Sequence, residues 1–322
     1  MILNPMKEQI KGKSIKMVLT EGHDPRVLEA ASLLLKDEMV LPVLVGDIKV
    51  IEALAAQHNW DISGCEKIDI ETYPAFNDMV ETMVELRKGK QSAEECAQML
   101  KQANYFGTML VKMDLAAGLV GGATYSTADT VRPALQLVKT KPGSKTVSSS
   151  MILYKDDKKY ICGDCAIIID PTSEDLVEIA KEMAQTARVF GIDPKVAFLS
   201  YSTKGSGKGP AVDKVVEAIK LIDKMAVDFA YDGELQFDAA FVPEVGQLKS
   251  PGSTVAGYAN AFVFPGIEAG NIGYKMVQRL GDYNALGPVL QGLNAPINDL
   301  SRGCSMKDVY ELCIVTAAQS LN

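Results

Sequence analysis

Short runs of β-branched and aliphatic residues alternate along this chain with longer segments of helical period. The first stretch of this pattern contains a strand predicted at Lys16–Leu19, a helix that begins at Pro25 and a second strand at Leu41–Val45. Strands separated by helices of this length are typical of a mostly parallel sheet covered by helices. The sequence therefore predicts an α/β fold.

The same alternation continues through the rest of the chain, with one interruption. A Pro/Gly/Ser/Lys segment at 139–144 precedes two apolar runs at 147–154 and 160–169, which predict a β-hairpin that opens a second domain. Before the hairpin, helices are predicted at 79–87, 93–102 and 129–138 and a strand at 115–120. After it, the pattern predicts helices at 175–190 and 211–225, strands at 196–200, 237–241 and 262–264, and a last helix that begins near Ser305.

The composition is that of a globular protein. The chain has 322 residues, enough for two domains, of which 47% are hydrophobic and 23% charged. A formal net charge of -8 argues against nucleic acid or an anionic membrane as partner, so an anionic ligand must be bound by local arginines. We expect no signal peptide and no membrane-spanning helix, because no apolar run approaches roughly 18 to 20 residues. Six cysteines are too few for a disulfide framework and are expected to be reduced, in the cytoplasm.

The segment from Gly121 to Arg132 follows a predicted strand and leads into a predicted helix. Its glycines permit a close approach of the backbone to a ligand, and the free N–H groups at the start of a helix favour an anion. Arg132 is expected in the first turn of that helix. The alternative is a plain strand-to-helix loop with Thr127 or Asp129 as the cap. The G-x-G-x-x-G spacing of dinucleotide-binding loops is absent.

Two other glycine-containing loops follow predicted strands. The loop at 202–210 lacks the Walker pattern, because Lys208 is followed by Gly209 and Ser202 stands where that pattern requires a glycine. A flexible basic loop is the favoured interpretation, with a weak phosphate contact as the alternative. The loop at 266–273 fits an anion-binding nest or a tight turn, and the sequence does not separate the two.

The stretch Ser301–Asp308 brings hydroxyl, guanidinium, thiol and carboxylate groups together within eight residues. Ser305 and Asp308 have the spacing of a capping box at the start of a helix, and that role alone would explain both residues. Arg302 is harder to explain structurally. A forked cation beside Gly303, just before the positive end of a helix, suits a phosphate or an acyl phosphate.

The pair Cys162-Gly-Asp-Cys165 is too incomplete for a zinc site, since no second pair at zinc spacing is present and His23 and His58 lie far away in the sequence. The pair falls within a predicted strand, which favours buried thiols over a thioredoxin-type role. Neither histidine has a nucleophile context and no G-x-S-x-G is present, so a Ser-His-Asp hydrolase is not expected.

Four longer segments occur in a fixed order along nearly the whole chain: GATYSTADTVRPA at 122–134, SYSTKGS at 200–206, EAGNIGY at 268–274 and PINDLSRGCS at 296–305. Together they resemble the phosphate acetyl/butyryltransferase family, the phosphotransacetylases. The resemblance implies a fold like that of the isocitrate and isopropylmalate dehydrogenases, with two α/β domains, a cleft between them and a homodimer. In that fold the C-terminal segment returns to the first domain, so the expected domains are 1–143 with 295–322, and 144–294.

The activity that the resemblance implies is the reversible transfer of an acetyl group between coenzyme A and orthophosphate, a reaction of acetate metabolism. Acetyl-CoA and phosphate give acetyl phosphate and CoA, by direct attack of the CoA thiolate in a ternary complex. CoA is therefore a substrate, and no cofactor is expected. No phosphoryl group is transferred, so no metal ion is required either.

The resemblance also assigns residues. The catalytic residues of the family correspond to Asp308, Ser301 and Arg302: the aspartate takes the thiol proton, the serine donates to the oxyanion and the arginine binds phosphate. The candidate contacts for CoA or phosphate are Arg132, Arg87, Cys304, Ser126 and Thr127. We interpret Cys304 as positional, because a direct transfer needs no acyl-enzyme.

Three alternatives remain open at this stage. A phosphate butyryltransferase, or another longer-chain phosphate acyltransferase, would differ only in the volume of its acyl pocket, and one methylene is worth about 1 to 3 kcal/mol of discrimination. A dehydrogenase on the same architecture would need a cluster of carboxylates for a divalent metal, which the sequence does not provide. A non-catalytic CoA-binding protein is disfavoured by the presence of Ser301, Arg302 and Asp308 together.

Overall fold

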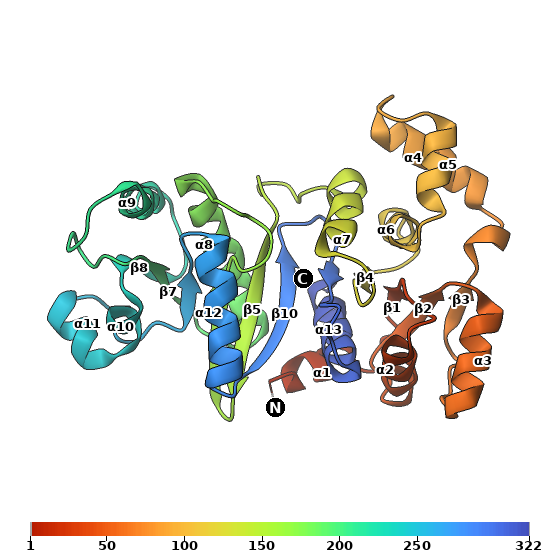
Figure 1. Ribbon diagram of the computed structural model, residues 1–322, viewed down its shortest axis with the longest axis horizontal. Coiled ribbons are helices and arrows are strands. Elements are labelled where there is room, and N and C mark those ends of the chain that lie inside the picture. The colour runs from red at the N-terminus through yellow and green to blue at the C-terminus, as the bar shows by residue number, and fades with distance from the viewer. Residues whose placement is uncertain (1, 322) are drawn as a thin grey trace. The chain divides into compact units, whose positions relative to one another are not determined.

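The computed structural model describes residues 2–321, and its two sheets covered by helices confirm the α/β prediction (Figure 1). The chain divides into two compact units. Unit 1 contains Leu3–Pro142 and the described residues from Leu293 on, and unit 2 contains Gly143–Gly292. No helix within residues 2–321 has the length and apolar character that crossing a membrane requires.

Unit 1 is built on five parallel strands in the order β11-β4-β1-β2-β3. Strands of a parallel sheet are covered on both faces and are therefore continuously apolar, as Met17, Val18 and Leu19 are in β1. The strands are β1 (Lys16–Leu19), β2 (Leu41–Val45), β3 (Glu66–Ile68), β4 (Gly118–Gly121) and β11 (Ile297–Asp299).

Helices cover this sheet, and their caps are already present in the sequence. Helix α2 has Pro25 at its first position, and its N-cap Asp24 accepts a hydrogen bond from the backbone of Arg26. Helix α6 approaches the sheet closely at Gly107, where an added Cβ would lie 2.9 Å from Leu119 Cδ1. The helices are α1 (Asn4–Ile10), α2 (Pro25–Lys36), α3 (Ile48–His58), α4 (Phe76–Arg87), α5 (Ala93–Leu100), α6 (Ala103–Lys112), α7 (Thr127–Pro133) and α13 (Met306–Gln319), with a 3-10 turn η1 (Ile70–Thr72) and a π-helical turn η2 (Ala134–Val138).

Unit 2 is built on a mixed sheet in the order β10-β5-β6-β9-β7-β8. Strands β5 and β6 form the predicted hairpin, and β10 pairs antiparallel with β5. The neighbours β6 and β9, β9 and β7, and β7 and β8 all pair in parallel. The strands are β5 (Ser148–Lys155), β6 (Lys158–Gly163), β7 (Lys195–Leu199), β8 (Ala230–Leu235), β9 (Ala261–Val263) and β10 (Asn284–Gln291). The helices are α8 (Ser173–Val189), α9 (Pro210–Ile222), α10 (Phe237–Phe241), α11 (Pro243–Lys249) and α12 (Ile267–Leu280).

The strand predicted at 237–241 is wrong, because these residues form the short helix α10. A run of five residues as short as Phe-Asp-Ala-Ala-Phe does not distinguish a helix from a strand. The helix brings Phe237 and Phe241 onto one face, where their rings stack with centroids 5.4 Å apart and both contact Phe262. The strand of this region is β8, directly before the helix.

Two further boundaries differ from the prediction. The helix predicted at 129–138 is divided into α7 and η2 at Pro133, which has no N–H to donate to the carbonyl of Asp129; that carbonyl instead accepts a hydrogen bond of 2.7 Å from Asn104 Nδ2. The second strand of the hairpin ends at Gly163 rather than at 169, because the carboxylate of Asp164 accepts hydrogen bonds from the backbone N–H groups of residues 166–168 and turns the chain.

Candidate active site

Three loops meet at the carboxyl edge of the unit 1 sheet. They follow the neighbouring strands β1, β4 and β11 and, together with the first residues of helices α2 and α7, comprise residues 20–26, 122–127 and 300–305. Parallel strands end at the same edge, which is where open α/β sheets bind their ligands. We call this region the strand-end site.

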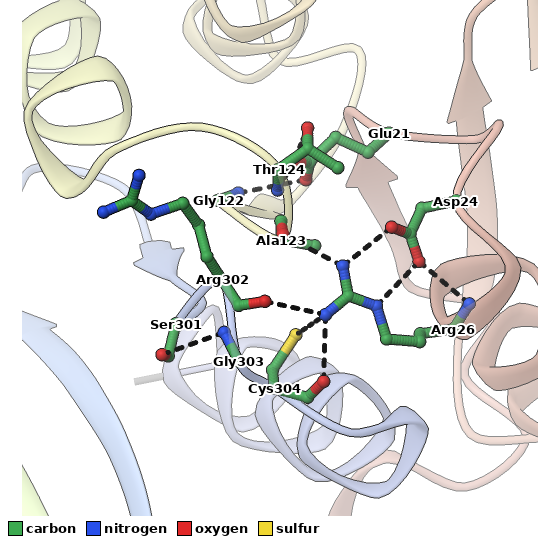
Figure 2. A network of polar contacts seen from close by, with 10 residues as sticks. All are labelled: Glu21, Asp24, Arg26, Gly122, Ala123, Thr124, Ser301, Arg302, Gly303 and Cys304. Atoms are coloured by element: carbon green, nitrogen blue, oxygen red, sulfur yellow. Dashed lines mark hydrogen bonds and ion pairs between the residues drawn. The ribbon is translucent and has the colours of Figure 1, made fainter.

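Glu21 joins the loop after β1 to the loop after β4 (Figure 2). Its carboxylate is only 2% exposed and accepts hydrogen bonds from Gly122 N at 3.0 Å, Thr124 N at 2.6 Å and Thr124 Oγ1 at 2.8 Å. Gly122 has φ +101°, and an added Cβ would clash with Asp299 Oδ1. The turn after β4 therefore requires glycine at this position.

Arg26 contacts all three loops, as Figure 2 shows. Its guanidinium forms a two-pronged ion pair with Asp24 and donates hydrogen bonds to the backbone carbonyls of Ala123, Arg302 and Cys304 at 2.9 to 3.0 Å. Burial acts to raise the pKa of Asp24, but the hydrogen bonds and charge of Arg26 outweigh it and hold that pKa below its usual range. The sequence pointed to none of Glu21, Asp24 and Arg26 as site residues, although their position directly after a strand is a recognisable signal.

Asp299, at the end of β11, binds the start of α7. Its two carboxylate oxygens accept hydrogen bonds from Thr127 Oγ1 at 2.6 Å and Thr130 Oγ1 at 2.5 Å. Burial raises the pKa of Asp299 to about 6, against the effect of the two hydroxyl hydrogen bonds. This interaction places Thr127, a predicted substrate contact, next to the loop that carries Ser301.

Ser301 and Arg302 are both exposed. Ser301 Oγ accepts a hydrogen bond of 3.3 Å from Gly303 N. Figure 2 shows the Arg302 side chain directed away from Arg26, and no hydrogen bond or ion pair within residues 2–321 engages its guanidinium. Arg302 thus has a fixed carbonyl and a side chain that is available to an anionic ligand.

Cys304, in the same loop, is buried, and its sulfur accepts a hydrogen bond of 3.6 Å from Arg26 Nη1. Burial raises the pKa of its thiol to about 11, although the charge of Arg26 acts in the opposite direction. At neutral pH the side chain is therefore a protonated thiol and a poor nucleophile.

Asp308 lies in the first turn of α13 and forms the predicted capping box with Ser305, which confirms that interpretation. Asp308 Oδ2 accepts hydrogen bonds from Ser305 N at 2.7 Å and Ser305 Oγ at 2.9 Å, while Asp308 N donates to Ser305 Oγ at 3.3 Å. Within the described chain no hydrogen bond or ion pair engages Oδ1. The cap thus uses one carboxylate oxygen of this half-buried residue and not the other.

The prediction for Arg132 needs correction, because this exposed residue lies in the last turn of α7 and not in the first. The helix begins earlier than expected: its N-cap is Ser126, and Asp129 completes a capping box from the third helical position, so neither Thr127 nor Asp129 is the N-cap. Ser126, a predicted substrate contact, therefore has a structural role in this cap.

Arg87 ends α4 and lies in the same neighbourhood as Arg132. Its side chain donates to Gln91 Oε1 at 2.6 Å and to the carbonyl of Gln136 at 3.5 Å. Burial raises the pKa of Tyr105, and the charges of both arginines act to lower it, so both lie close to this tyrosine. No hydrogen bond or ion pair between described residues joins either arginine to Ser301, Arg302 or Asp308.

Two of the other sequence motifs have internal roles in unit 2. In the loop at 202–210, Gly205 N and Ser202 Oγ donate hydrogen bonds of 2.7 and 2.9 Å to the buried carboxylate of Glu234 in β8. These two donors of the loop are therefore already used within the protein. Cys162 and Cys165 are buried free thiols, as interpreted from the sequence, and burial raises the pKa of both. Among residues 2–321 no group of three or more His, Cys, Asp or Glu side chains is arranged to hold a metal ion.

Comparison with known proteins agrees with the motifs. The family model "Phosphate acetyl/butaryl transferase" matches residues 1–317. The phosphate acetyltransferase of Bacillus subtilis (strain 168) is 50% identical over 320 residues, and that of Staphylococcus aureus (strain MRSA252) is 52% identical over 324 residues; each alignment covers 99% of both chains. A solved phosphotransacetylase from Streptococcus pyogenes is 50% identical, has a TM-score of 0.96 and is matched over 99% of this chain and 98% of its own. On this agreement of sequence and fold over its whole length, the chain belongs to the phosphate acetyl/butaryl transferase family.

Proposed function

We propose that this protein is a phosphate acetyltransferase, which transfers an acetyl group reversibly between coenzyme A and orthophosphate. The family membership and the names of relatives at 50–52% identity support the acetyl group over a longer acyl chain. The observation that carries the proposal is the state of Arg302: its carbonyl is fixed by Arg26, and its exposed guanidinium extends from a loop that continues directly into α13 and Asp308. A free guanidinium in a fixed position suits a phosphate group.

In the reaction that we propose, Arg302 binds the phosphate group of acetyl phosphate. The CoA sulfur attacks the acetyl carbonyl carbon while the thiol proton passes to Asp308 Oδ1, the oxygen that the helix cap does not use. Ser301 donates a hydrogen bond to the carbonyl oxygen as negative charge develops there. The bond from carbon to the phosphate oxygen then breaks, and its electron pair remains on the phosphate.

The remaining candidate residues make or break no bond in the proposed reaction. Arg132 and Arg87 are proposed to contact phosphate groups of CoA, and Ser126 and Thr127 to hold the start of α7 for that purpose. Cys304 is not an acyl carrier in this proposal, because its buried thiol has a pKa of about 11. Acyl transfer between oxygen and sulfur involves no oxidation or reduction, so we propose that CoA is a substrate and that no cofactor takes part.

The test is thioester formation, followed by ultraviolet absorbance after acetyl phosphate and CoA are mixed with the purified protein. We expect rapid turnover, and a loss of about 10² to 10⁴-fold in Asp308→Asn if the carboxylate is the base. Asparagine retains an oxygen that can accept the cap hydrogen bonds. The matched control is Ser305→Ala, which removes the cap hydroxyl at a cost of about 1 kcal/mol but leaves the carboxylate in place.

The outcomes separate the two roles of Asp308. Activity close to wild type in Ser305→Ala together with a large loss in Asp308→Asn would support the base. Equal losses in the two variants would reduce Asp308 to a helix cap. A wild type that accepts butyryl phosphate but not acetyl phosphate would move the substrate to a longer acyl chain, and a protein that binds CoA without turnover with either substrate would be a CoA-binding protein.

We also propose that the protein is a homodimer. Helix α12 of unit 2 exposes an apolar row at intervals of four residues, in which Ile272, Met276 and Leu280 are 59%, 53% and 80% exposed. We expect light scattering to give the mass of a dimer, and Met276→Glu to weaken it. Leu248→Glu, at an exposed apolar position on α11, is the control. A monomeric wild type would contradict this proposal.

A cytoplasmic location is the last part of the proposal. All six cysteines are free and buried in the described chain, which is typical of proteins from a reducing compartment. We expect acyl-transfer activity in the cytoplasmic fraction of the source cells. Recovery of the protein in a membrane or extracellular fraction would contradict this location.

A further inference from the structure

We propose that Arg26, held by Asp24, is a positioning residue for the reaction: it fixes the main chain of the loop 300–305 and so determines where Ser301 and Arg302 present their side chains. This inference rests on the proposed function. It concerns a pair of residues that touches neither the acyl group nor the phosphate in the proposed reaction.

The hydrogen bonds of Arg26 show that it positions the loop and does not bind substrate. A guanidinium has five N–H donors. Nε donates to Asp24 Oδ1 at 2.9 Å, and Nη2 donates to Asp24 Oδ2 at 2.7 Å and to the carbonyl of Ala123 at 2.9 Å. Nη1 donates to the carbonyls of Arg302 at 2.9 Å and Cys304 at 3.0 Å. All five donors are occupied within the protein, so none remains for a phosphate.

The acceptors explain why this residue controls the loop. Arg302 and Cys304 present carbonyls that lie on either side of Gly303 and converge on a single nitrogen atom of Arg26. The third carbonyl, that of Ala123, belongs to the loop after β4. One planar group therefore holds the loop 300–305 against the loop after β4, in a geometry that a single lysine ammonium does not reproduce.

The charge of the pair is also suited to a positioning role. Asp24 is 8% exposed, and its carboxylate neutralises the guanidinium beside it at 2.7 Å. The hydrogen bond with Asp24 raises the pKa of Arg26 still further, so Arg26 stays charged throughout. Because the Asp–Arg pair has zero net charge, it does not itself attract phosphate. That role falls to Arg302, whose guanidinium points away from the pair in Figure 2.

The decisive experiment is a double-mutant cycle of Arg26→Gln and Arg302→Gln, with kcat and the KM for acetyl phosphate as readouts. If Arg26 acts through Arg302, Arg26→Gln should cost about 10²-fold in kcat/KM in the wild-type background, because displacement of a catalytic group by about 1 Å has that effect. In the Arg302→Gln background it should cost less than about threefold. A residue with a merely structural role would give equal losses in both backgrounds, and that result would overturn the proposal.

Two companion variants and one control complete the design. Arg26→Lys keeps the charge but loses the fork, and should lose nearly as much activity as Arg26→Gln; full activity in the lysine variant would overturn the proposal. Asp24→Asn keeps a good N-cap and a hydrogen-bond acceptor; it replaces Arg26→Gln if that variant fails to fold, and should lose about tenfold in activity. Arg188→Gln removes an exposed Arg–Asp pair from unit 2 and should leave activity unchanged.

Hydrogen exchange gives a readout that does not depend on activity. We expect Arg26→Gln to accelerate exchange in a peptide that covers residues 300–305 and to leave peptides of residues 143–292 unchanged. Unchanged exchange at 300–305 would overturn the positioning role whatever the kinetics show. A wild type without any acyl transfer would instead overturn the proposed function, and the role of Arg26 in that reaction with it.

Discussion

Replacement of Asp299 by asparagine should change how the stability of the protein depends on pH. Asp299 is 1% exposed, and burial raises the pKa of its carboxyl to about 6, whereas an aspartate in an unfolded chain has a pKa of about 3.9. The folded protein therefore binds the proton more tightly than the unfolded chain does. The stabilisation from this proton is complete below about pH 4 and is lost as the pH rises through about 6.

The size of the effect follows from the difference between the two pKa values. Two pKa units correspond to about 3 kcal/mol of linked free energy in total, of which about 2 kcal/mol is expected between pH 4.5 and pH 7.5. The asparagine side chain in Asp299→Asn would carry no such proton but would keep an oxygen that can accept a hydrogen bond from Thr127 or Thr130. The stability advantage of wild type over Asp299→Asn should therefore shrink by about 2 kcal/mol across this range.

The assay is urea unfolding of both proteins at several pH values in that range, with the difference in unfolding free energy plotted against pH. Asp170→Asn is the control, because the hydrogen bond from Lys214 lowers the pKa of Asp170, so that the linked stabilisation is lost only below the pH range tested. The difference between wild type and Asp170→Asn should therefore stay nearly constant from pH 4.5 to 7.5. A difference between wild type and Asp299→Asn that stays constant from pH 4.5 to 7.5, or grows with pH, would refute the reasoning.

Three further substitutions test the packing and the chemistry of unit 1. Gly107→Ala would bring a Cβ to 2.9 Å from Leu119 Cδ1 and should cost about 1 to 3 kcal/mol in urea unfolding; an unchanged midpoint would show that the neighbours relax freely. Gly122 has φ +101°, and Gly122→Ala would place a Cβ against Asp299 Oδ1, so the loops of the strand-end site must shift and acyl transfer should fall by about 10²-fold; wild-type turnover would contradict the described geometry. Cys304→Ala should retain activity within about tenfold, and a trapped acetyl-cysteine in the wild type would contradict its assignment as a non-reacting thiol.

The sequence was most informative where a pattern is local. The capping box of Ser305 and Asp308 is present as predicted, because a cap involves only residues three positions apart. Prediction failed where the environment decides the conformation: 237–241 forms a helix because Phe237 and Phe241 pack together against Phe262. The turn that holds Arg132 was also misplaced, since the start of α7 depends on the cap formed by Ser126.

The site itself shows the same division. Ser301, Arg302 and Asp308 are neighbours in the chain, so the resemblance in that one segment was enough to propose them as a group. Arg26 carries no comparable signal. Its partners Ala123 and Cys304 are 97 and 278 positions away, and nothing in the local sequence indicates which carbonyls it will meet.

The sequence by itself determined the α/β class, the family and the segment that carries the proposed chemistry, because apolar period, helix caps and contiguous motifs are properties of neighbouring residues. Only the tertiary structure decided that the loops after β1, β4 and β11 come together, because the strand order β11-β4-β1 is a property of the whole sheet. The same packing decided which side-chain donors form hydrogen bonds within the protein. Arg26 uses every donor within the fold, whereas Arg302, on a loop that Arg26 fixes, keeps its guanidinium exposed.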